Sequence, residues 1–346
     1  MKKFYAIIGN PPYQEETDSN GRKQPIYNIF MDASYKVGNK VELITPGRFL
    51  FNAGQTPVEW NEKMLSDAHL KVLSYESNAS TIFSGTDIKG GIAITLHDSG
   101  RDIGPIHVFT IYPELNSIIQ KVDALTVNQK RLNVLFASQR LYKLSDKFFH
   151  DNANDENVKA ILKSGTRTKI TSSFIEKMDE VFTQSPIPKA DNLRFLARIA
   201  GKRQWRYVPR FYIRDNDYLD SFKLFIPEAN NSGQYGEILA EPVIGKPGEG
   251  TADTFLNAGP FVTMEEVVNL SRYYRTKFFR GLLGARKVTQ HSPSQVWEMI
   301  PMQDFTSSSD IDWMSSVSDV DNQLYRKYGL TTDEIAFIES HVKEMD

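Results

Sequence analysis

The residues best suited to chemistry in this chain form one short loop, Asn10-Pro11-Pro12-Tyr13. Each proline lacks an N–H group and has a fixed φ, so two in succession make a stiff loop that presents carbonyl acceptors. The Asn10 side chain adds a further carbonyl acceptor, and the Tyr13 ring can stack on a flat base. Such a loop could accept both hydrogens of a planar NH2 group and leave the nitrogen lone pair facing a methyl donor.

The segments around this loop predict the elements that position it. An apolar run and Gly9 precede Asn10, which is typical of a buried strand that ends in a tight loop. In open α/β sheets, ligands bind where such strands end. A helix with Ile26, Phe30 and Val37 on one face follows, and the remaining predicted strands are 41–46, 71–75 and 91–96. Because strand, loop, helix and strand alternate, we expect an α/β fold with a partial doubly wound, Rossmann-like sheet.

The Asn10-Pro11-Pro12-Tyr13 loop resembles motif IV of the S-adenosylmethionine-dependent amino-methyltransferases, above all the DNA N6-adenine enzymes, and is identical to it over all four residues. The elements after the loop resemble the layout of the gamma class. The resemblance implies that these four residues are catalytic. It also implies that S-adenosylmethionine is the methyl donor, that no metal takes part, and that Tyr27 on the following helix is a candidate donor contact.

Beyond Tyr112 the sequence pattern changes, and we expect three parts. Residues 1–112 would form the catalytic half of a methyltransferase domain, residues 113–305 a helical connector and a mixed α+β target-recognition domain, and residues 306–346 an acidic helical tail. The segments 296–305 and 324–330 resemble the recognition region and tail of restriction–modification methylases of the gamma arrangement. Two strong helices are predicted here, over 264–283 with Thr263 as its cap and over 332–343.

Basic residues without acids between them gather in two segments, although the net charge of the chain is only −2. The segment 202–214 contains five basic residues and four aromatics, and the segment 272–287 contains six basic residues. Arg272, Thr276 and Arg280 would share one face of a continuous helix. We therefore expect double-stranded DNA as a partner, and the candidate DNA-binding residues are Lys202, Arg203, Arg206, Arg210, Arg272, Arg280, Arg286 and Lys287.

The methyl donor requires a Gly-rich loop after a strand, followed by an acidic residue. Only nine residues precede Asn10, so we expect a partner chain or an upstream segment to carry the donor-binding motif. The one alternative inside the chain is the segment Gly245–Thr251, where Pro247 and the lack of a clear following helix weaken the match. A restriction endonuclease is a further candidate partner.

Composition excludes several other classes. The chain has no cysteine, which removes disulfides and thiolate metal sites. Its six histidines show no metal-ligand spacing, so we expect no metal site. The longest apolar runs are too short to span a bilayer, and the N-terminal run is too short for a signal peptide. We expect a cytoplasmic protein without membrane contact.

Three alternative functions stay open. The first is a non-catalytic DNA-recognition subunit that has kept the motif. The second is a protein-glutamine methyltransferase, which uses the same tetrapeptide on a side-chain amide but lacks a long extension after it. The third is N4-cytosine methylation, whose loop usually begins with Ser or Asp and is therefore disfavoured by Asn10.

Overall fold

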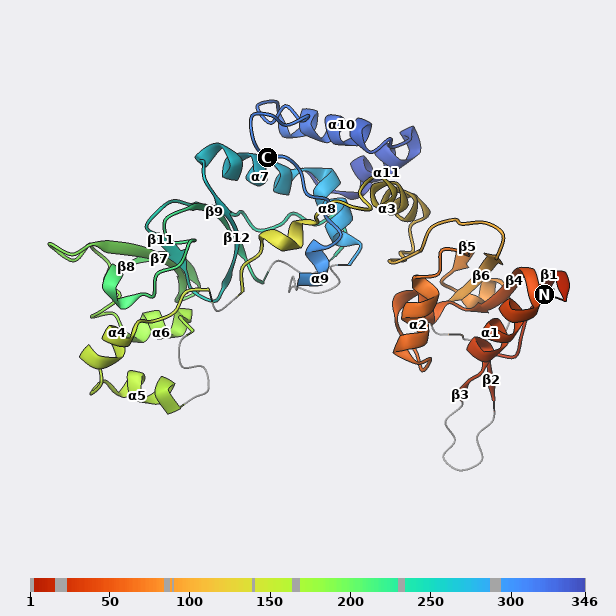
Figure 1. Cartoon of the computed structure of the whole chain (residues 1–346), viewed down its shortest axis with the longest axis horizontal. Helices are drawn as coiled ribbons and strands as arrows, with labels where there is room; N and C mark the ends of the chain where they lie inside the picture. Colours follow the sequence, from red (N-terminus) through yellow and green to blue (C-terminus); the bar gives the residue numbers. More distant parts are fainter. Residues whose placement is uncertain are drawn as a thin grey trace. The chain divides into compact units, whose positions relative to one another are not determined.

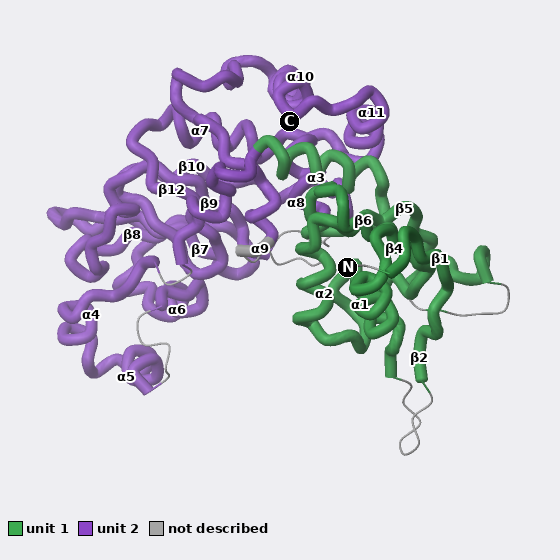
Figure 2. Tube along the Cα trace, turned by 45° about the vertical axis from the view of Figure 1, so that its right-hand side comes forward, with its two compact units in different colours: residues 1–125 green, residues 126–346 purple. Residues whose placement is uncertain are grey.

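The computed structural model describes residues 3–15, 24–83, 88, 90–138, 141–163, 169–229, 234–286 and 294–345. The chain divides into two compact units, Met1–Leu125 and Thr126–Asp346, which Figure 2 shows in green and purple. It is a mixed α/β protein with several small sheets, and one of them is a four-stranded sheet in unit 1.

The four-stranded sheet of unit 1 has the order β1-β4-β6-β5 (Figure 1). Strands β1 and β4 are parallel, whereas β6 lies antiparallel between β4 and β5. All four strands lie where the sequence predicted them. Strands β1, β4 and β5 run in one direction and β6 runs in the other, so the sheet is mixed and the doubly wound prediction holds only in part. Their bounds are Phe4–Gly9 for β1, Gly38–Pro46 for β4, Leu70–Glu76 for β5 and Ile92–Asp98 for β6.

One face of this sheet is covered by two helices. A helix lies where one was predicted, α1, Tyr27–Val37, but the predicted face of Ile26, Phe30 and Val37 is wrong, because α1 buries Tyr27 and Met31 and leaves Phe30 42 % exposed. A second helix, α2, covers Val58–Leu65. Alternate β4 residues Val41 and Leu43 point into the core that these helices close. The remaining core side chains include Tyr27 and Met31 of α1, Trp60 and Met64 of α2, Leu70 of β5 and Ala93 of β6.

The opposite face of the sheet, and the free edge of β1, are far more exposed. Phe4 and Ile8 of β1 are 54 % and 79 % exposed, and Leu73 of β5 is 45 % exposed. Strand β1 pairs with β4 only, so its second edge has no strand beside it in the part of unit 1 that the structure describes. The apolar run that predicted a buried strand therefore forms an edge strand with uncovered side chains.

The remaining elements of unit 1 are short, apart from one helix. Helix α3, Pro113–Leu125, lies at the start of the segment predicted as a helical connector, and it buries Leu115, Ile118, Ile119 and Val122. The short elements are β2, Gln14–Glu15, β3, Gln24–Pro25, and the 3-10 turns η1, Gly47–Phe51, and η2, Ala79–Thr81.

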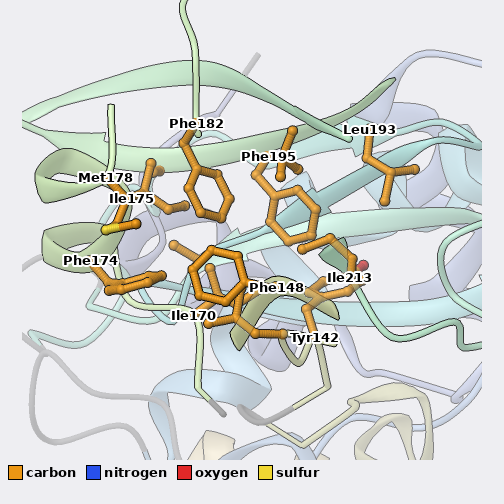
Figure 3. Packing of buried hydrophobic residues seen from close by; sticks show 14 of the residues in the cluster. Tyr142, Phe148, Ile170, Phe174, Ile175, Met178, Phe182, Leu193, Phe195 and Ile213 are labelled. Carbon is orange, nitrogen blue, oxygen red and sulfur yellow. The ribbon is translucent and has the colours of Figure 1, made fainter. Parts of the chain in front are cut away.

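Unit 2 contains two three-stranded sheets, β10-β9-β12 and β11-β7-β8. Helices α4 and α6 pack on the β7–β8 hairpin, and their phenylalanines meet it in the core shown in Figure 3. Phe195 of β7 lies edge to face with Tyr142, their ring centres 5.2 Å apart. The strand bounds are Asn192–Ile199 for β7, Lys202–Pro209 for β8, Phe222–Pro227 for β9, Val243–Gly245 for β10, Glu249–Thr251 for β11 and Phe255–Phe261 for β12.

The predicted long helix 264–283 is two helices. Thr263 caps α7, Met264–Arg275, and Glu266 completes a capping box as the sequence indicated. Thr276 then takes extended backbone angles, φ −61° and ψ 148°, and its hydroxyl caps the next helix α8, Lys277–Gly284. The prediction that Arg272, Thr276 and Arg280 share one helical face is therefore wrong, because the helix axis breaks at Thr276.

The other helices of unit 2 are mostly short. The predicted last helix is found as α11, with the slightly shorter bounds Thr332–His341. The others are η3, Leu132–Leu135, α4, Asp146–Asp151, α5, Glu156–Lys163, α6, Ser172–Lys177, η4, Arg210–Tyr212, α9, Ser294–Trp297, and α10, Val317–Lys327.

Candidate active site

The Asn10–Tyr13 loop begins where β1 ends. Gly9, the last residue of β1, lies opposite Leu43 of the parallel strand β4. Because parallel strands have their carboxyl ends at the same edge of a sheet, the loop after β1 and the η1 turn after β4 meet there. This is the position that the sequence predicted for the chemistry.

A pocket of about 110 Å³ lies beside this loop. Tyr13 from the loop, Tyr27 from α1 and Arg48 from η1 line it. The other lining residues are Gln14, Pro25, Pro46, Gln55 and Ile88. The pocket thus combines aromatic rings with one cationic side chain at the carboxyl ends of β1 and β4.

Backbone hydrogen bonds hold Tyr13 in place. The Ile26 N–H, just before α1, donates to the Tyr13 carbonyl at 3.1 Å. The short ladder of β2 and β3, with Gln14 opposite Pro25, extends this link. Tyr13 is therefore attached to the start of α1 as well as to the end of β1.

The Asn10 and Tyr13 side chains are neighbours. Burial raises the pKa of the Tyr13 phenol, and the adjacent Asn10 side chain lowers that pKa in part. Asn10 itself is exposed, while Tyr13 is half-buried. The loop therefore presents an accessible amide carbonyl beside a partly covered aromatic ring.

Tyr27 belongs to the hydrophobic core of unit 1 and also lines the pocket beside Tyr13. Only 4 % of it is exposed, and its ring lies edge to face with Trp60 at 6.1 Å between ring centres. Burial raises the pKa of the Tyr27 phenol, and the Thr56 side chain and the Arg48 charge oppose this rise. Packing in the core explains the aromatic ring at this position, and its predicted contact with the donor stays a prediction.

Arg48 is the pocket residue that the sequence analysis missed. It is the second residue after the end of β4, and a Cβ atom at Gly90 would come within 2.4 Å of its Cγ. Gly90 has φ +85° and so takes a conformation that favours glycine while leaving room for the Arg48 stem. The one sequence signal for Arg48 is its place just after the Thr45-Pro46 end of a strand, which is also where β1 has its loop.

Comparison with known proteins relates the N-terminal part of the chain to a methylase family. Residues 1–83 match the Eco57I restriction-modification methylase family. This methylase region contains β1, the Asn10–Tyr13 loop and Arg48. A curated relative, an uncharacterized adenine-specific methylase of Mycoplasma pneumoniae, is 27 % identical over 96 residues, which are 27 % of this chain and 23 % of the relative. The chain therefore spans about a quarter of that relative's length.

Two solved structures resemble the chain at low similarity. The type IIG restriction endonuclease BpuSI matches 94 % of this chain and 49 % of its own, with 9 % identity and a TM-score of 0.32. The type IIL restriction-modification enzyme MmeI, solved in complex with DNA, matches 97 % of this chain and 56 % of its own, with 9 % identity and a TM-score of 0.29. The chain spans about half the length of each.

Two of the candidate DNA-binding arginines are buried in unit 2. Arg206 is 9 % exposed and donates to the Gln204 side chain at 2.8 Å and to the Trp205 carbonyl at 3.0 Å. Arg280 is 2 % exposed, and its Nε donates to the Arg275 carbonyl at 3.2 Å. Both guanidinium groups are therefore covered within unit 2 and do not lie on its exposed surface.

Other candidates are paired with acids. Arg210 donates to Asp220 at 2.5 Å and to Asp215 at 3.0 Å. Arg286 lies 3.5 Å from Glu298. Because each positive charge already faces a carboxylate, these residues add little net potential to the surface.

The last four candidates differ in their surroundings. Arg272 donates to the Ser315 carbonyl at 2.8 Å. Lys202 and Arg203 are exposed at the start of β8. Lys287 lies outside the described residues. Lys202 and Arg203 are thus the candidates that the fold leaves accessible without an acidic partner in the part of the chain that the structure describes.

The two basic segments meet at one residue, Glu241. Its backbone carbonyl accepts from Arg203 at 2.7 Å, and its carboxylate accepts from Arg275 at the end of α7 at 2.6 Å. The start of β8 and the end of α7 are therefore joined through a single residue.

The segment Gly245–Thr251 does not form an open glycine loop. Its ends are strands β10 and β11. A Cβ atom at Gly245 would lie 2.3 Å from the Phe225 ring, and one at Gly250 would lie 2.8 Å from the Phe195 ring. These glycines make room for core rings, so the segment does not fit a methyl donor.

The described residues meet the requirements of neither a membrane-spanning helix nor a metal site. Among the described residues, no helix is long and apolar enough to cross a membrane. The same residues contain no group of three or more His, Asp or Glu side chains placed to hold a metal ion.

Proposed function

We propose that this chain is the catalytic-loop and target-recognition portion of an S-adenosylmethionine-dependent DNA N6-adenine methyltransferase from a restriction–modification system. One observation carries the proposal. Asn10 and Tyr13 lie side by side at the carboxyl ends of two parallel strands, against a pocket, within the region that matches the methylase family.

Asn10, Pro11 and Tyr13 of the loop then have roles in aligning the adenine amine. The adenine must leave the duplex, because its N6 is occupied in the base pair. Tyr13 stacks on the flipped base beside the pocket, and the Asn10 amide oxygen and the Pro11 carbonyl accept the two N6 hydrogens. The donor would supply an electrophilic methyl carbon, so that the N6–carbon bond forms as the carbon–sulfur bond breaks, with the neutral thioether leaving and the N6 proton released to solvent. Alignment and fixed dipoles provide the rate enhancement.

The donor site requires polypeptide beyond the residues described. Gly245 and Gly250 face core rings, and the described residues that line the pocket beside Tyr13 include no glycine. The uncovered side chains Phe4 and Ile8 and the free edge of β1 support a partner chain or upstream segment that lies against this strand. That polypeptide would carry the donor-binding motif.

Unit 2 would supply target recognition on duplex DNA. Lys202 and Arg203 support this role, since both are exposed and lie where the two basic segments meet through Glu241. A cytoplasmic location and an associated restriction endonuclease complete the proposal.

The decisive experiment is methyl transfer. The chain is combined with the polypeptide that carries the donor-binding motif, labelled S-adenosylmethionine and duplex DNA, and the DNA is digested to nucleosides. N6-methyladenine is the expected product. N4-methylcytosine, or labelled protein in place of labelled DNA, would refute the assignment.

A calorimetric titration tests the source of the donor site separately. The isolated chain is expected to bind S-adenosylmethionine weakly or not at all, because its described residues offer no donor loop. A micromolar dissociation constant would show that this chain contains a complete donor site.

A further inference from the structure

Two arginines face each other at the tip of the β7–β8 hairpin. The strands are joined by Ala200 and Gly201, which have φ 47° and 76°, and positive φ at both central residues is typical of a tight type I′ turn. Arg198 of β7 lies directly opposite Arg203 of β8. Like charges in directly opposite positions destabilise a hairpin, so this pair calls for a compensating anion.

No acid of the described chain provides that anion. Other arginines of unit 2 have a carboxylate: Arg194 contacts Glu249, and Arg275 contacts Glu241. Arg198 and Arg203 have no ion pair among the residues that the structure places. Both are exposed, and together they leave a local excess of positive charge.

Arg203 is held in position by neutral groups. Its Nη1 donates to the Glu241 carbonyl at 2.7 Å, and its guanidinium carbon lies 5.8 Å from the centre of the Phe255 ring. These contacts fix the plane of the guanidinium and leave donors of its fork for an external acceptor. A fixed fork of this kind is suited to two oxygens of one phosphate.

The two arginines also line one hollow of about 460 Å³. It lies beyond the buried cluster of Leu196, Phe225 and Phe255, on the side of the hairpin where Leu196 and Arg198 both point. Its lining contains the Glu228 carboxylate as well, so the two guanidinium groups outnumber the acid. The hollow is large enough for a phosphate group to enter it.

We propose that Arg198 and Arg203 together grip one backbone phosphate of duplex DNA in this hollow. The inference rests on the proposed function for the identity of the polyanion, and it adds Arg198, which the charge pattern of the sequence did not single out. The hairpin tip is then a positioning element that sets the register of unit 2 on the duplex, since phosphate contacts orient a protein without reading bases.

The test is the salt dependence of binding of the full chain to a short labelled duplex. Between about 50 and about 200 mM salt, each neutralised phosphate contributes about 0.9 to the slope of log affinity against log salt. Arg198→Ala and Arg203→Ala should each lower that slope by about 1, and the double variant should lower it by about the same amount, because one phosphate is lost in all three. Arg198→Lys should keep most of the slope.

Arg214→Ala is the matched control, because this exposed arginine of unit 2 already faces Asp146 at 2.9 Å. Its slope should equal that of the unmodified chain, and circular dichroism should show that every variant is folded. If the double variant lowers the slope of log affinity against log salt by about 2, the two arginines contact separate phosphates, and the proposal of one shared phosphate is refuted. Unchanged slopes would overturn it while leaving methyl transfer intact, whereas a chain that binds no duplex at all would refute both this inference and the proposed function.

Discussion

Strands β1 and β9 have the same length and mostly apolar sequences, but opposite surroundings. β1 reads Phe-Tyr-Ala-Ile-Ile-Gly and β9 reads Phe-Lys-Leu-Phe-Ile-Pro, and both are short and apolar. Every residue of β9 after Phe222 is buried, whereas none of β1 is, and four of its six residues are exposed. An apolar strand indicates that a cover exists, but not which polypeptide supplies it. In unit 2 the chain supplies its own cover, while the described residues of unit 1 leave the outer side of the strand that leads to Asn10 uncovered.

The largest effect on stability is expected in the covered unit. Phe195→Ala removes a ring with no exposed surface that packs against Tyr142 and Phe182. The free energy of unfolding should fall by about 3–5 kcal/mol, measured by urea denaturation. Phe211→Ala, at a position 50 % exposed in the same unit, should change it by no more than about 0.5 kcal/mol. Similar losses for both would contradict a closed core here.

The largest effect on chemistry is expected in the open unit. Asn10→Ala removes one acceptor for the adenine amine, and loss of one preorganised transition-state hydrogen bond costs about 10²–10³ in rate. Single-turnover methyl transfer by the reconstituted enzyme measures this loss, and DNA binding should be unchanged. Asn39→Ala, an exposed asparagine near the start of β4, is the control and should keep full activity. Full activity in Asn10→Ala would refute the role of the loop.

Tyr13 should show a smaller effect that depends on the ring. Tyr13→Ala removes the surface on which the base stacks, and such stacking contributes about 1–3 kcal/mol per base. The rate should fall accordingly, while Tyr13→Phe should stay close to the unmodified enzyme because the ring is kept. A Phe variant as slow as the Ala variant would assign the role to the hydroxyl.

Burial of a carboxyl group should also make the stability of unit 2 depend on pH. Burial raises the pKa of Asp321 to about 7, although its carboxylate accepts from the N–H groups of Lys277 and Phe278 at the start of α8. The folded state then binds the proton more tightly than the unfolded chain, so this group lowers stability as the pH rises from about 4 to about 7. Asp321→Asn should flatten that part of the profile in urea denaturation. An unchanged profile would show that another group titrates.

The smallest effect is expected at β1. Phe4→Ser should change the unfolding free energy of the isolated chain by no more than about 0.5 kcal/mol, because 54 % of Phe4 is already exposed. The same substitution should weaken association with the polypeptide that carries the donor-binding motif, measured by calorimetry. A large loss of stability in the isolated chain would show that this face of unit 1 is covered from within.

Local sequence patterns predicted the positions of strands and helices better than the direction in which the strands pair or the points at which helices break. The apolar runs gave the four strands of unit 1, and Thr263 with Glu266 gave the start of α7. The direction of β6 depends on pairing with segments far away in the sequence, which no local pattern encodes. The break at Thr276 was hidden because threonine fits both a helix interior and a cap.

For the site, a motif was a better guide than a count of charges. Asn10 and Tyr13 lie together because a strand must end before them, and that ending is visible in the sequence. Arg206 and Arg280 were predicted to contact DNA from charge alone, yet their carbonyl and side-chain acceptors come from the fold. Arg48 escaped notice because a single arginine after a strand has no pattern of its own.

The free edge of β1 has a consequence for the solubility and turnover of the protein in a cell. An uncovered apolar strand edge can pair with any other exposed strand, including that of a second copy. Copies made in excess of whatever covers β1 would then aggregate or be removed by chaperones and proteases. The amount of folded, functional protein would then be limited by the amount of the polypeptide that covers β1, and not by the rate at which this chain is synthesised.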